Sequence, residues 1–545
     1  MRALPEGEAL FAAVRRRISP QTKLAFGSTF LTGLLTHAYM LVNKLPNHDD
    51  ILGLFIKNDS TAYGRWFLSV PSALSSSLSL PWVTGLLALL WLSLAAVCTV
   101  SLLQIKKPAM VVLTGMVMAT FPTVFYTLCY LFTADAYLFA LLLAALGVLF
   151  TDRYRFGFLL GGVCIGLSMA TYQAYVFYAI GLIALRLMLL LLFEPGTTAG
   201  DALKKLAQYA AALVIGAVVY RVGMSVALAC KGMQLKTYMG LDGMQSLSVS
   251  SILSRLPLAY KGYFSLLTGK SELLPGWMNA FLLAFNHLAG LALFVAALLR
   301  VKGPRRMMKI ALSTAILCAL PLALNGIVLV STAGFHPLMQ YPVCLAYVLP
   351  IVLYDRLAAA QRAELEAGRA PTPADTRRNA LRIPLGYALS LCLVAGSFLW
   401  ALDANQTYLV LELKFDNMMS LVTRMVDRVE QLPEYVPNVT PVWYTGTLSD
   451  ANYGAIKSDA FARASATDMT GREWNYTTIM NNLYFLAFVN NYIGVTFVDP
   501  PDAEAYAAME TDEYKAMPYF PSPGSVKSIN GIIIVNGGPN PQSPP

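Results

Sequence analysis

Residues 82–105 read WVTGLLALLWLSLAAVCTVSLLQI, an apolar run without a charged side chain. An α-helix needs about 20 such residues to cross the hydrocarbon core of a bilayer, so this run predicts a membrane-spanning helix. Similar segments recur along the chain, and the run 156–193 is divided near Tyr172-Gln173 because it is too long for one span. The sequence therefore predicts an α-helical polytopic membrane protein with about eleven transmembrane helices. The predicted spans are 24–44, 82–105, 108–132, 134–151, 156–172, 174–193, 205–225, 277–299, 308–331, 338–354 and 384–402.

The overall composition agrees with a membrane protein. Of the 545 residues, 56% are apolar and 13% are charged, against about 45–50% and about 25% in soluble proteins. So few charges cannot solvate a surface of this size, which excludes a soluble enzyme, a disordered protein and a nucleic-acid-binding domain as whole-chain descriptions. The net charge is +9, but residues 403–545 hold sixteen Asp+Glu against eight Lys+Arg. The basic excess therefore lies in the membrane part and indicates no nucleic-acid partner.

Basic residues on short loops indicate the cytoplasmic side of a membrane protein. Here they lie on alternate loops, as Lys106-Lys107 illustrates, whereas the short loops near Asp135 and Gln173 carry none. The apolar segment after the basic N-terminus is long enough to span, so it is not a cleavable signal. The sequence predicts a cytoplasmic N-terminus at 1–23, a transmembrane domain at 24–402 with long outer loops 45–81 and 226–276, and an extracytoplasmic C-terminal domain at 403–545.

The C-terminal segment is predicted to form a small α/β domain of ordinary size. An amphipathic helix is expected over 404–432, where Leu411, Met418 and Met425 share one face. A second helix is expected over 473–491. The predicted strands are 441–444, 493–498 and 531–535.

Three aspartates stand out because charges near the outer surface are few. Asp49-Asp50 follows the first span, and Asp135 lies at the outer end of the fourth. Adjacent carboxylates in a partly desolvated cleft repel each other, which raises one pKa and suits a general base or a site for a hard metal ion. Two solvated loop acids are the simpler alternative for the pair. A helix N-cap is the simpler alternative for Asp135.

Other polar and aromatic residues are candidates for substrate binding. Arg65 beside Trp66 suits a phosphate, although the two also suit an interfacial anchor. Tyr172-Gln173 interrupts a very apolar run and could stack on a sugar and bind its hydroxyls, or form a polar turn between spans. His336 is expected in an outer loop, where it could bind a phosphate or a substrate hydroxyl.

The second long outer loop carries basic residues that could hold a phosphate through charge-assisted hydrogen bonds. Binding to an anionic lipid surface is an equal alternative. The sequence has no phosphate-cradling GxxxxGK[ST] motif, no HExxH motif and no metal-ligand spacing among its seven cysteines. No cofactor is indicated with certainty, and a divalent metal stays an open alternative. The candidate phosphate ligands are Lys231, Lys236, Arg255 and Lys261.

Four short motifs occur in a fixed order after the first span. They are Asn47-His48-Asp49-Asp50, Gly64-Arg65-Trp66, Thr133-Ala134-Asp135-Ala136-Tyr137 and Ala170-Thr171-Tyr172-Gln173. In order and placement this series resembles the bacterial type II O-antigen glucosyltransferase family, which comprises serotype-converting polytopic enzymes of the GT-C class. The resemblance covers roughly residues 30–400, and the C-terminal domain has no match to a known sugar-binding module.

The resemblance implies a glycosyltransferase on the outer face of the bacterial plasma membrane. Its donor would be a polyprenyl-phosphate sugar, usually glucose, and its acceptor a cell-surface glycan or its lipid-linked precursor. In such enzymes an acid in the first outer loop assists the acceptor hydroxyl, and Asp49 or Asp50 matches that place. Asp135 matches the second acidic position. The grip of the 226–276 basic residues on the donor phosphate is a hypothesis outside the resemblance.

A transporter or flippase for a lipid-linked glycan is the alternative function. It would also need polar groups in the membrane, and it predicts paired broken helices and internal repeats. The sequence shows no such repeat. A structural or sensory membrane protein is a third possibility, in which the aspartates would be dispensable. Convergence of Asp49, Asp50, Asp135 and Arg65 at one outer site would favour the enzyme.

Overall fold

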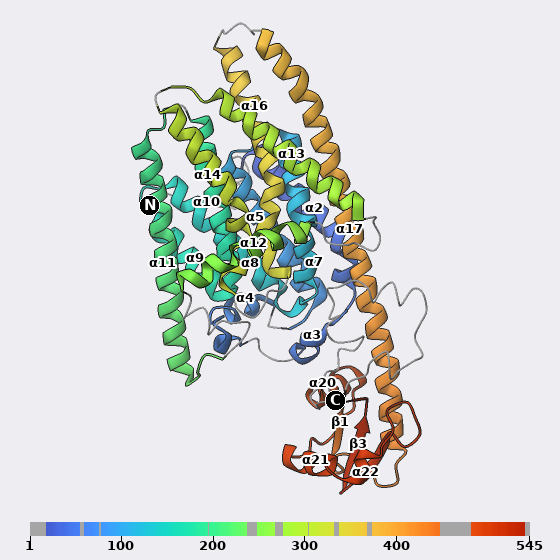
Figure 1. Cartoon of the computed structure of the whole chain (residues 1–545). Coiled ribbons are helices and arrows are strands. Elements are labelled where there is room, and N and C mark those ends of the chain that lie inside the picture. Colours follow the sequence, from blue (N-terminus) through green and yellow to red (C-terminus); the bar gives the residue numbers. More distant parts are fainter. Residues whose placement is uncertain are drawn as a thin grey trace, which may run out of the picture.

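Prolines mark where several helices begin in the computed structural model (Figure 1). Each such proline suits the first helical position, where a backbone amide would have no partner. Pro122 also breaks a helix, since α6 and α7 are bent by 44° on either side of Phe121. The helices that start at proline are α2 (Pro20–Val42), α5 (Pro81–Leu103), α6 (Pro108–Thr120) and α7 (Pro122–Leu128). The structure describes residues 18–54, 59–75, 78–194, 196–236, 248–267, 276–303, 305–331, 337–367, 373–446 and 481–539.

The remaining elements of the bundle are further long helices and several short turns. The long helices are α8 (Leu131–Arg153), α9 (Gly157–Thr171), α10 (Val176–Phe193), α11 (Ala199–Lys231), α12 (Val249–Leu267), α13 (Gly276–Arg300), α14 (Arg306–Leu324) and α16 (Cys344–Glu366). The short elements are α3 (His48–Gly53), η1 (Thr61–Tyr63), α4 (Ser69–Ser72), η2 (Ala73–Ser75), η3 (Gln173–Tyr175), α15 (Ile327–Val330) and η5 (Pro337–Val343).

Glycines let α9 and α11 approach closely. A Cβ atom on Gly162 would lie 2.6 Å from the Ile215 side chain, and one on Gly166 would lie 2.7 Å from that of Val219. The spacing of these two glycines is the small-residue pattern through which helices pack in membranes. The packing explains how α9, with only 15 residues, is held in the bundle.

Nine helices of the described residues are long and apolar enough to span a membrane, or up to ten if α6 and α7 form one bent span. The chain is therefore a multi-pass membrane protein. The predicted number of eleven is not confirmed, because α9 is shorter than the approximately 20 residues that a span requires. Its predicted division from α10 near Tyr172-Gln173 is confirmed, since α9 ends at Thr171 and η3 begins at Gln173.

Basic loops gather at one end of the bundle. The amides of Lys106 and Lys107 donate to the Asp355 carboxylate at 3.0 and 2.8 Å, and Arg356 donates to Gln104 at 2.7 Å. Elements α3 and α4 lie at the other end, toward the C-terminal domain (Figure 1). This separation is what alternating basic and non-basic loops predict, while the side that faces the cytoplasm stays a prediction.

Helix α17 (Pro373–Glu430) has 58 residues and connects the bundle to the C-terminal domain. The predicted span 384–402 and the predicted amphipathic helix 404–432 are thus parts of one continuous helix. Leu411, Met418 and Met425 are buried, as the amphipathic pattern predicts.

The C-terminal domain has a three-stranded sheet in the order β1-β3-β2. β1 (Val442–Thr445) is parallel to β3 (Ile532–Asn536), and β2 (Val526–Ile529) is antiparallel to it. The predicted strand 493–498 is wrong: the chain ends a π-helical turn at Ile493 and forms only a single bridge from Val498 to Pro441. The helical elements are α20 (Asn482–Phe488), η7 (Val489–Ile493), α21 (Asp502–Met509) and α22 (Asp512–Lys515).

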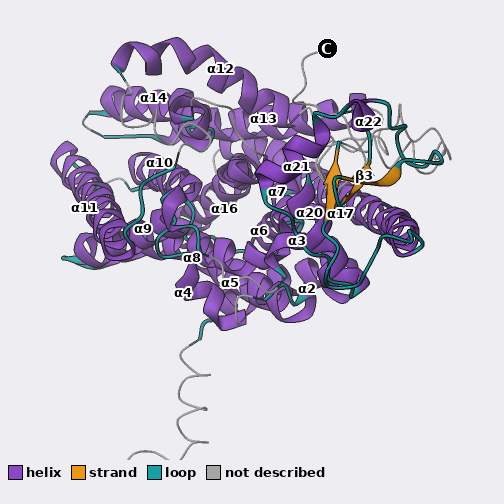
Figure 2. Ribbon diagram, turned by 90° about the horizontal axis from the view of Figure 1, so that it is seen from below, coloured by secondary structure: helices purple, strands orange, loops and turns teal. Residues whose placement is uncertain are grey.

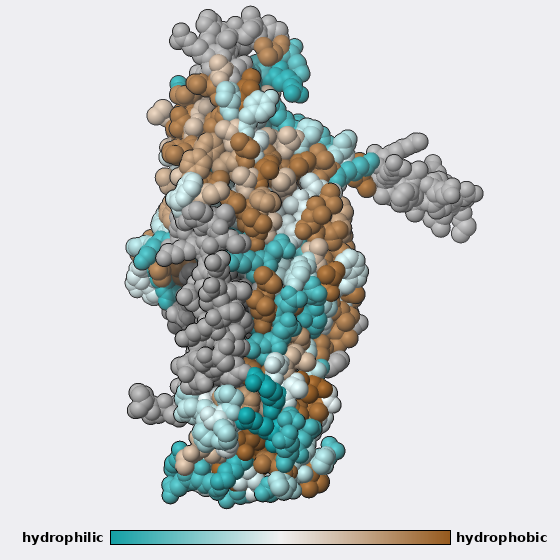
Figure 3. All heavy atoms as spheres, turned by 90° about the vertical axis from the view of Figure 1, so that its right-hand side faces the viewer, coloured by the Kyte–Doolittle hydropathy of each residue, from teal (hydrophilic) through white to brown (hydrophobic). Residues whose placement is uncertain are grey.

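The surface reflects the two parts of the molecule. On the face shown in Figure 3, hydrophobic side chains gather over the upper part of the helical bundle, and hydrophilic ones dominate the C-terminal domain. A bilayer would solvate the first surface and water the second.

Candidate active site

The N-terminal end of α8 is where the segment between α2 and α5 meets the bundle. Asp50 Oδ1 accepts hydrogen bonds from the Phe132 amide at 3.1 Å and from the Ser79 hydroxyl at 2.9 Å. Phe132 is the second residue of α8, so its amide has no partner inside the helix. Asp50 supplies that partner and ties the loop to α8.

The sequence Asn47-His48-Asp49-Asp50 forms the start of α3. Asn47 is the N-cap: its side chain accepts from the Asp50 amide at 3.0 Å, while the Asp50 carboxylate accepts from the Asn47 amide at 3.4 Å. This is a capping box, with Asp in the place usually taken by Glu or Gln. Asn47 Nδ2 also donates to the Cys129 carbonyl at 2.7 Å, so the short helix is fixed to the end of α7.

Asp50 and Asp49 differ in access although they are neighbours. Asp50 is fully buried, whereas Asp49 is half-buried. Burial raises the pKa of Asp50, and the nearby Lys44 ammonium and three hydrogen bonds oppose that rise. The hydrogen bonds of Asp50 orient the loop, and of the two carboxylates Asp49 is the one that is partly exposed.

Asp135 lies in the second turn of α8 and is 1% exposed. The alternative that it caps the helix is wrong, because α8 begins at Leu131 with Tyr130 as its N-cap. Oδ1 accepts from the Ala136 amide at 2.8 Å. Ser75 lies beside the carboxylate, but its hydroxyl donates to the Ser72 carbonyl, and Oδ2 is buried without a hydrogen-bond partner among the described residues.

Arg65 approaches α8 two residues after Asp135, at Tyr137. Its Nη1 donates to the Tyr137 hydroxyl at 2.8 Å, and its guanidinium carbon lies 5.7 Å from the Tyr137 ring and 5.2 Å from the Tyr172 ring. The two rings are stacked, with centroids 4.2 Å apart. Arg65 is thus held by cation–π contacts and one hydrogen bond, and Tyr172 is part of the same cluster.

Trp66 anchors the loop to α11, and Gln173 anchors it to η3. Trp66 Nε1 donates to the Tyr220 carbonyl at 3.1 Å, and Gln173 Nε2 donates to the Tyr63 carbonyl at 3.2 Å. Gly64 makes this approach possible, because its φ of +75° and a Cβ only 2.7 Å from the Tyr220 hydroxyl would disfavour any other residue. These two side chains hold the loop that presents Arg65.

The predicted phosphate ligands of 226–276 do not join this cluster. Lys231 forms an ion pair with Asp59 at 2.7 Å, and Lys236 lies over the Tyr63 ring at 5.9 Å. Arg255 donates to the Ser331 carbonyl at 2.7 Å, and Lys261 is exposed on α12. His336 lies outside the described residues.

Lys44 is a cation that the sequence reasoning missed. Its ammonium donates to the Ser79 carbonyl at 3.0 Å, and burial lowers its pKa while the charge of Asp50 opposes that shift. Its position three residues before Asn47 is the feature of the sequence that could have marked Lys44 as a candidate. Ser79, which donates to Asp50, has no such feature, because it follows a serine-rich stretch without a recognisable motif.

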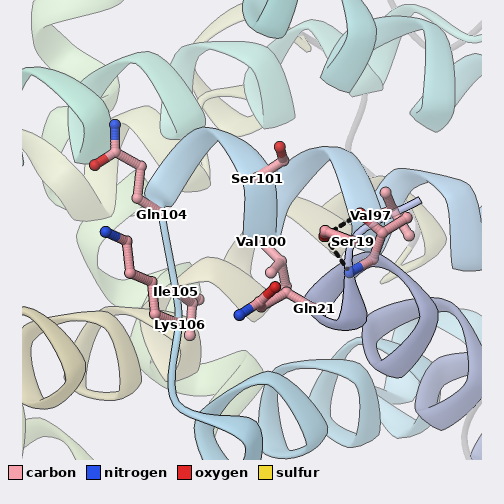
Figure 4. Close-up of a pocket in the computed structure, with 9 residues that line it drawn as sticks. Ser19, Gln21, Val97, Val100, Ser101, Gln104, Ile105 and Lys106 are labelled. Carbon is pink, nitrogen blue, oxygen red and sulfur yellow. Dashed lines mark hydrogen bonds between the residues drawn. The ribbon is translucent and has the colours of Figure 1, made fainter. Parts of the chain in front are cut away.

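A cavity of about 260 Å³ lies at the opposite end of the bundle, between the start of α2 and the end of α5 (Figure 4). It is far along the helices from the aspartates, since Ser19 and Lys106 belong to the end with the basic loops. Among the described residues no group of three or more His, Cys, Asp or Glu side chains could hold a metal ion. The lining residues are Ser19, Gln21, Thr22, Val97, Val100, Ser101, Gln104, Ile105 and Lys106.

Comparison with models of protein families gives one assignment. Residues 38–353 match the model described as glucosyl transferase GtrII. Neither a curated protein nor a solved structure matches the chain. The matched segment is more than half of the 545 residues and includes Asp49, Asp50, Arg65 and Asp135. It also confirms the resemblance read from the four motifs. The chain therefore belongs to the glucosyl transferase GtrII family of glycosyltransferases.

Proposed function

We propose that this protein transfers a sugar, glucose in the first instance, from a polyprenyl-phosphate donor to a cell-surface glycan or its lipid-linked precursor. The reaction would take place on the outer face of the bacterial plasma membrane, with the C-terminal domain on the same side. The family assignment supports sugar transfer. The donor, the acceptor and the side of the membrane are part of the proposal.

The convergence of Asp50, Asp135 and Arg65 on the first two turns of α8 carries this proposal. These residues come from three separate sequence motifs, yet each contacts or belongs to the same helix end. Asp49 adjoins them through α3. The N-terminal end of a helix also favours an anion such as a phosphate.

The roles follow from access and charge. Asp49, half-buried beside the fully buried Asp50, would take the proton from the acceptor hydroxyl as general base. The acceptor oxygen would then bond to the anomeric carbon of the sugar as the bond from that carbon to the phosphate oxygen breaks. The electron pair leaves with the polyprenyl phosphate, whose negative charge Arg65 would stabilise. A single displacement of this kind inverts the anomeric centre.

Asp50 and Asp135 would act on the same reaction without taking the proton. The Asp50 oxygens already accept hydrogen bonds from the amides of Asn47 and Phe132 and from the Ser79 hydroxyl, so Asp50 is a positioning residue. Asp135 offers the buried Oδ2 atom, which would accept a hydrogen bond from a sugar hydroxyl.

The test is transfer of labelled glucose from polyprenyl-phosphate glucose to isolated surface glycan by the purified protein. Asp49→Asn is expected to lower kcat by at least about 100-fold, as loss of a general base does. Asp201→Asn is the matched control, because Asp201 is an exposed carboxylate in the first turn of α11. Full activity of Asp49→Asn would remove Asp49 as the base. A wild-type protein that moves the lipid-linked sugar across vesicles without transferring it would support the flippase instead.

A further inference from the structure

The C-terminal domain contacts the helix that carries the aspartate pair. In Figure 1, α3 lies between the bundle and α20, and Figure 2 shows the two helices side by side from below. Ile51, the residue after Asp50, is fully buried, and its side chain belongs to the apolar core of the C-terminal domain together with Met418, Phe485 and Phe488. The first outer loop thus contributes a side chain to the core of the last domain.

Asn491 makes the polar part of this contact. Its Nδ2 atom donates to the Ile51 carbonyl at 3.0 Å. The last carbonyls of a helix have no partner within it, so Asn491 supplies a partner to α3 from a segment 440 residues away. Asn491 lies on η7, a single π-helical turn, and such turns are often found at functional sites.

Tyr492 brings the same turn close to the acid site. Its ring stacks on Phe488 at 5.2 Å and meets Phe415 edge-on at 5.4 Å. Burial, and then the charge of Asp50, raise the pKa of Tyr492. The turn therefore lies within electrostatic range of the Asp50 carboxylate.

Helix α3 is consequently held at both of its ends. Asn47 and Asp50 fix the first turn to α7 and α8, and Asn491 fixes the carbonyl side to the C-terminal domain. Asp49 lies on α3 between these attachments, so a displacement of the helix displaces its carboxylate as well.

We propose that Asn491 is a positioning residue for glycosyl transfer, which holds the carbonyl end of α3 and thereby directs Asp49 at the acceptor. The proposal rests on the proposed function, in which Asp49 is the base. It gives the C-terminal domain, outside the segment 38–353 that matches the family, a part in the reaction.

The first experiment compares Asn491→Ala with Asn490→Ala. The control changes the same residue type one position away. Asn490 donates to Asn491 Oδ1 at 3.4 Å and accepts from Thr496 at 3.2 Å, so its replacement leaves the bond from Asn491 Nδ2 to Ile51 in place. Asn491→Ala is expected to lower kcat about tenfold, since small displacements of a reacting group are costly, with the donor KM changed less than about twofold. Asn491→Gln, which keeps an amide donor, is expected to restore part of the rate. Equal kcat values for Asn491→Ala and Asn490→Ala would overturn the proposal.

A double variant separates positioning from a general loss of structure. If Asn491 acts through Asp49, adding Asn491→Ala to Asp49→Asn lowers kcat by less than about twofold, because residues that act as a unit are not additive. A further tenfold loss would show that Asn491 acts by another route.

Hydrogen exchange tests the contact between Asn491 and α3 without an activity assay. The amides of residues 48–53 are expected to exchange at least about fivefold faster in Asn491→Ala than in Asn490→Ala, with the β3 amides unchanged. If the wild type transfers no sugar, the proposed function fails, and this measurement still decides the role of Asn491 in holding α3. Unchanged exchange at 48–53 would overturn that role.

Discussion

The Asp50 carboxylate accepts a hydrogen bond from the Phe132 amide at 3.1 Å. This bond crosses from α3 to the first turn of α8, three residues before Asp135. The position of the acid pair is therefore set by a helix end of the bundle and not by the conformation of the loop alone.

Removing the Asp50 side chain is expected to destabilise the fold. Asp50→Ala leaves the Ser79 hydroxyl and the amides of Asn47 and Phe132 without their acceptor, at a cost of about 2–4 kcal/mol. Asp50→Asn keeps one acceptor oxygen and is expected to cost less than half of that. Thermal melting of the detergent-purified protein measures both variants, and equal melting temperatures for wild type and Asp50→Ala would contradict the expectation.

The pH dependence of stability offers a second test at Asp50. Burial raises its pKa above the ordinary 3.8, so the folded state binds the proton more tightly than the unfolded state. The contribution of this group to stability is full below about pH 4 and is lost as the pH rises through the raised pKa. The melting temperature of wild type relative to Asp50→Asn is expected to fall over that rise in pH. A flat difference would contradict a raised pKa.

Tyr137 is expected to matter through its hydroxyl. Tyr137→Phe keeps the stack on Tyr172 but removes the acceptor of the Arg65 hydrogen bond. Because Arg65 is proposed to bind the donor phosphate, the donor KM should rise about fivefold, with stability changed by less than about 1 kcal/mol. Tyr154→Phe is the control, because Tyr154 is 60% exposed. A donor KM equal to that of the control would separate Tyr137 from donor binding.

Tyr492→Phe is expected to leave stability unchanged or to raise it. The Tyr492 hydroxyl is buried without a hydrogen-bond partner among the described residues, and burial of an unsatisfied hydroxyl costs about 1–3 kcal/mol. The phenylalanine ring retains the contacts with Phe488 and Phe415. Thermal melting checks this, and a variant less stable by more than about 1 kcal/mol would indicate a partner for the hydroxyl.

Variants of the ion pair between Lys231 and Asp59 test the hypothesis that Lys231 binds the donor phosphate. The hydrogen bond from Lys231 is the main reason that the pKa of Asp59 falls to about 2, so the pair stabilises the fold above about pH 4 and is lost as the pH falls through 2. Both partners are over one-third exposed, and such pairs contribute about 0–1 kcal/mol.

If the pair only anchors the loop, Lys231→Met and Asp59→Asn are expected to change the donor KM equally and by less than about threefold. A much larger rise in KM for Lys231→Met alone would restore the idea that Lys231 binds the donor phosphate. Steady-state kinetics with polyprenyl-phosphate glucose distinguishes the two outcomes.

Much of the bundle could be predicted because hydrophobic length depends on the sequence alone. Runs such as 82–105 and 174–193 correspond closely to α5 and α10. The strand predicted over 493–498 does not form. Its apolar residues alternate as in a strand, but the preceding π-turn and Gly494 at φ +84° change the direction of the chain. Tertiary context overrides β-propensity in this way.

The sequence could predict which residues belong to the candidate site, but it could not predict the role of each residue. The sequence indicated Asp50 and Asp135, yet whether a carboxylate is buried or accessible depends on which amides and hydroxyls surround it. Phe132, Ser79 and Asn491 are far from Asp50 along the chain and carry no motif of their own. Lys231 and Arg255 contact Asp59 and the Ser331 carbonyl instead, and no motif in the sequence indicates these partners.

The length of α17 has a practical consequence for dividing the molecule. At about 1.5 Å per residue, its 58 residues extend about 87 Å, nearly three times the thickness of a hydrocarbon core of about 30 Å. Met418, Val422 and Val429 of this helix are buried in the core of the C-terminal domain. A fragment that began after Glu430 would lose these α17 side chains from its core. A fragment that began at 403 would still lack Ile51. The C-terminal domain is therefore not separable by proteolysis or truncation without exposing its core.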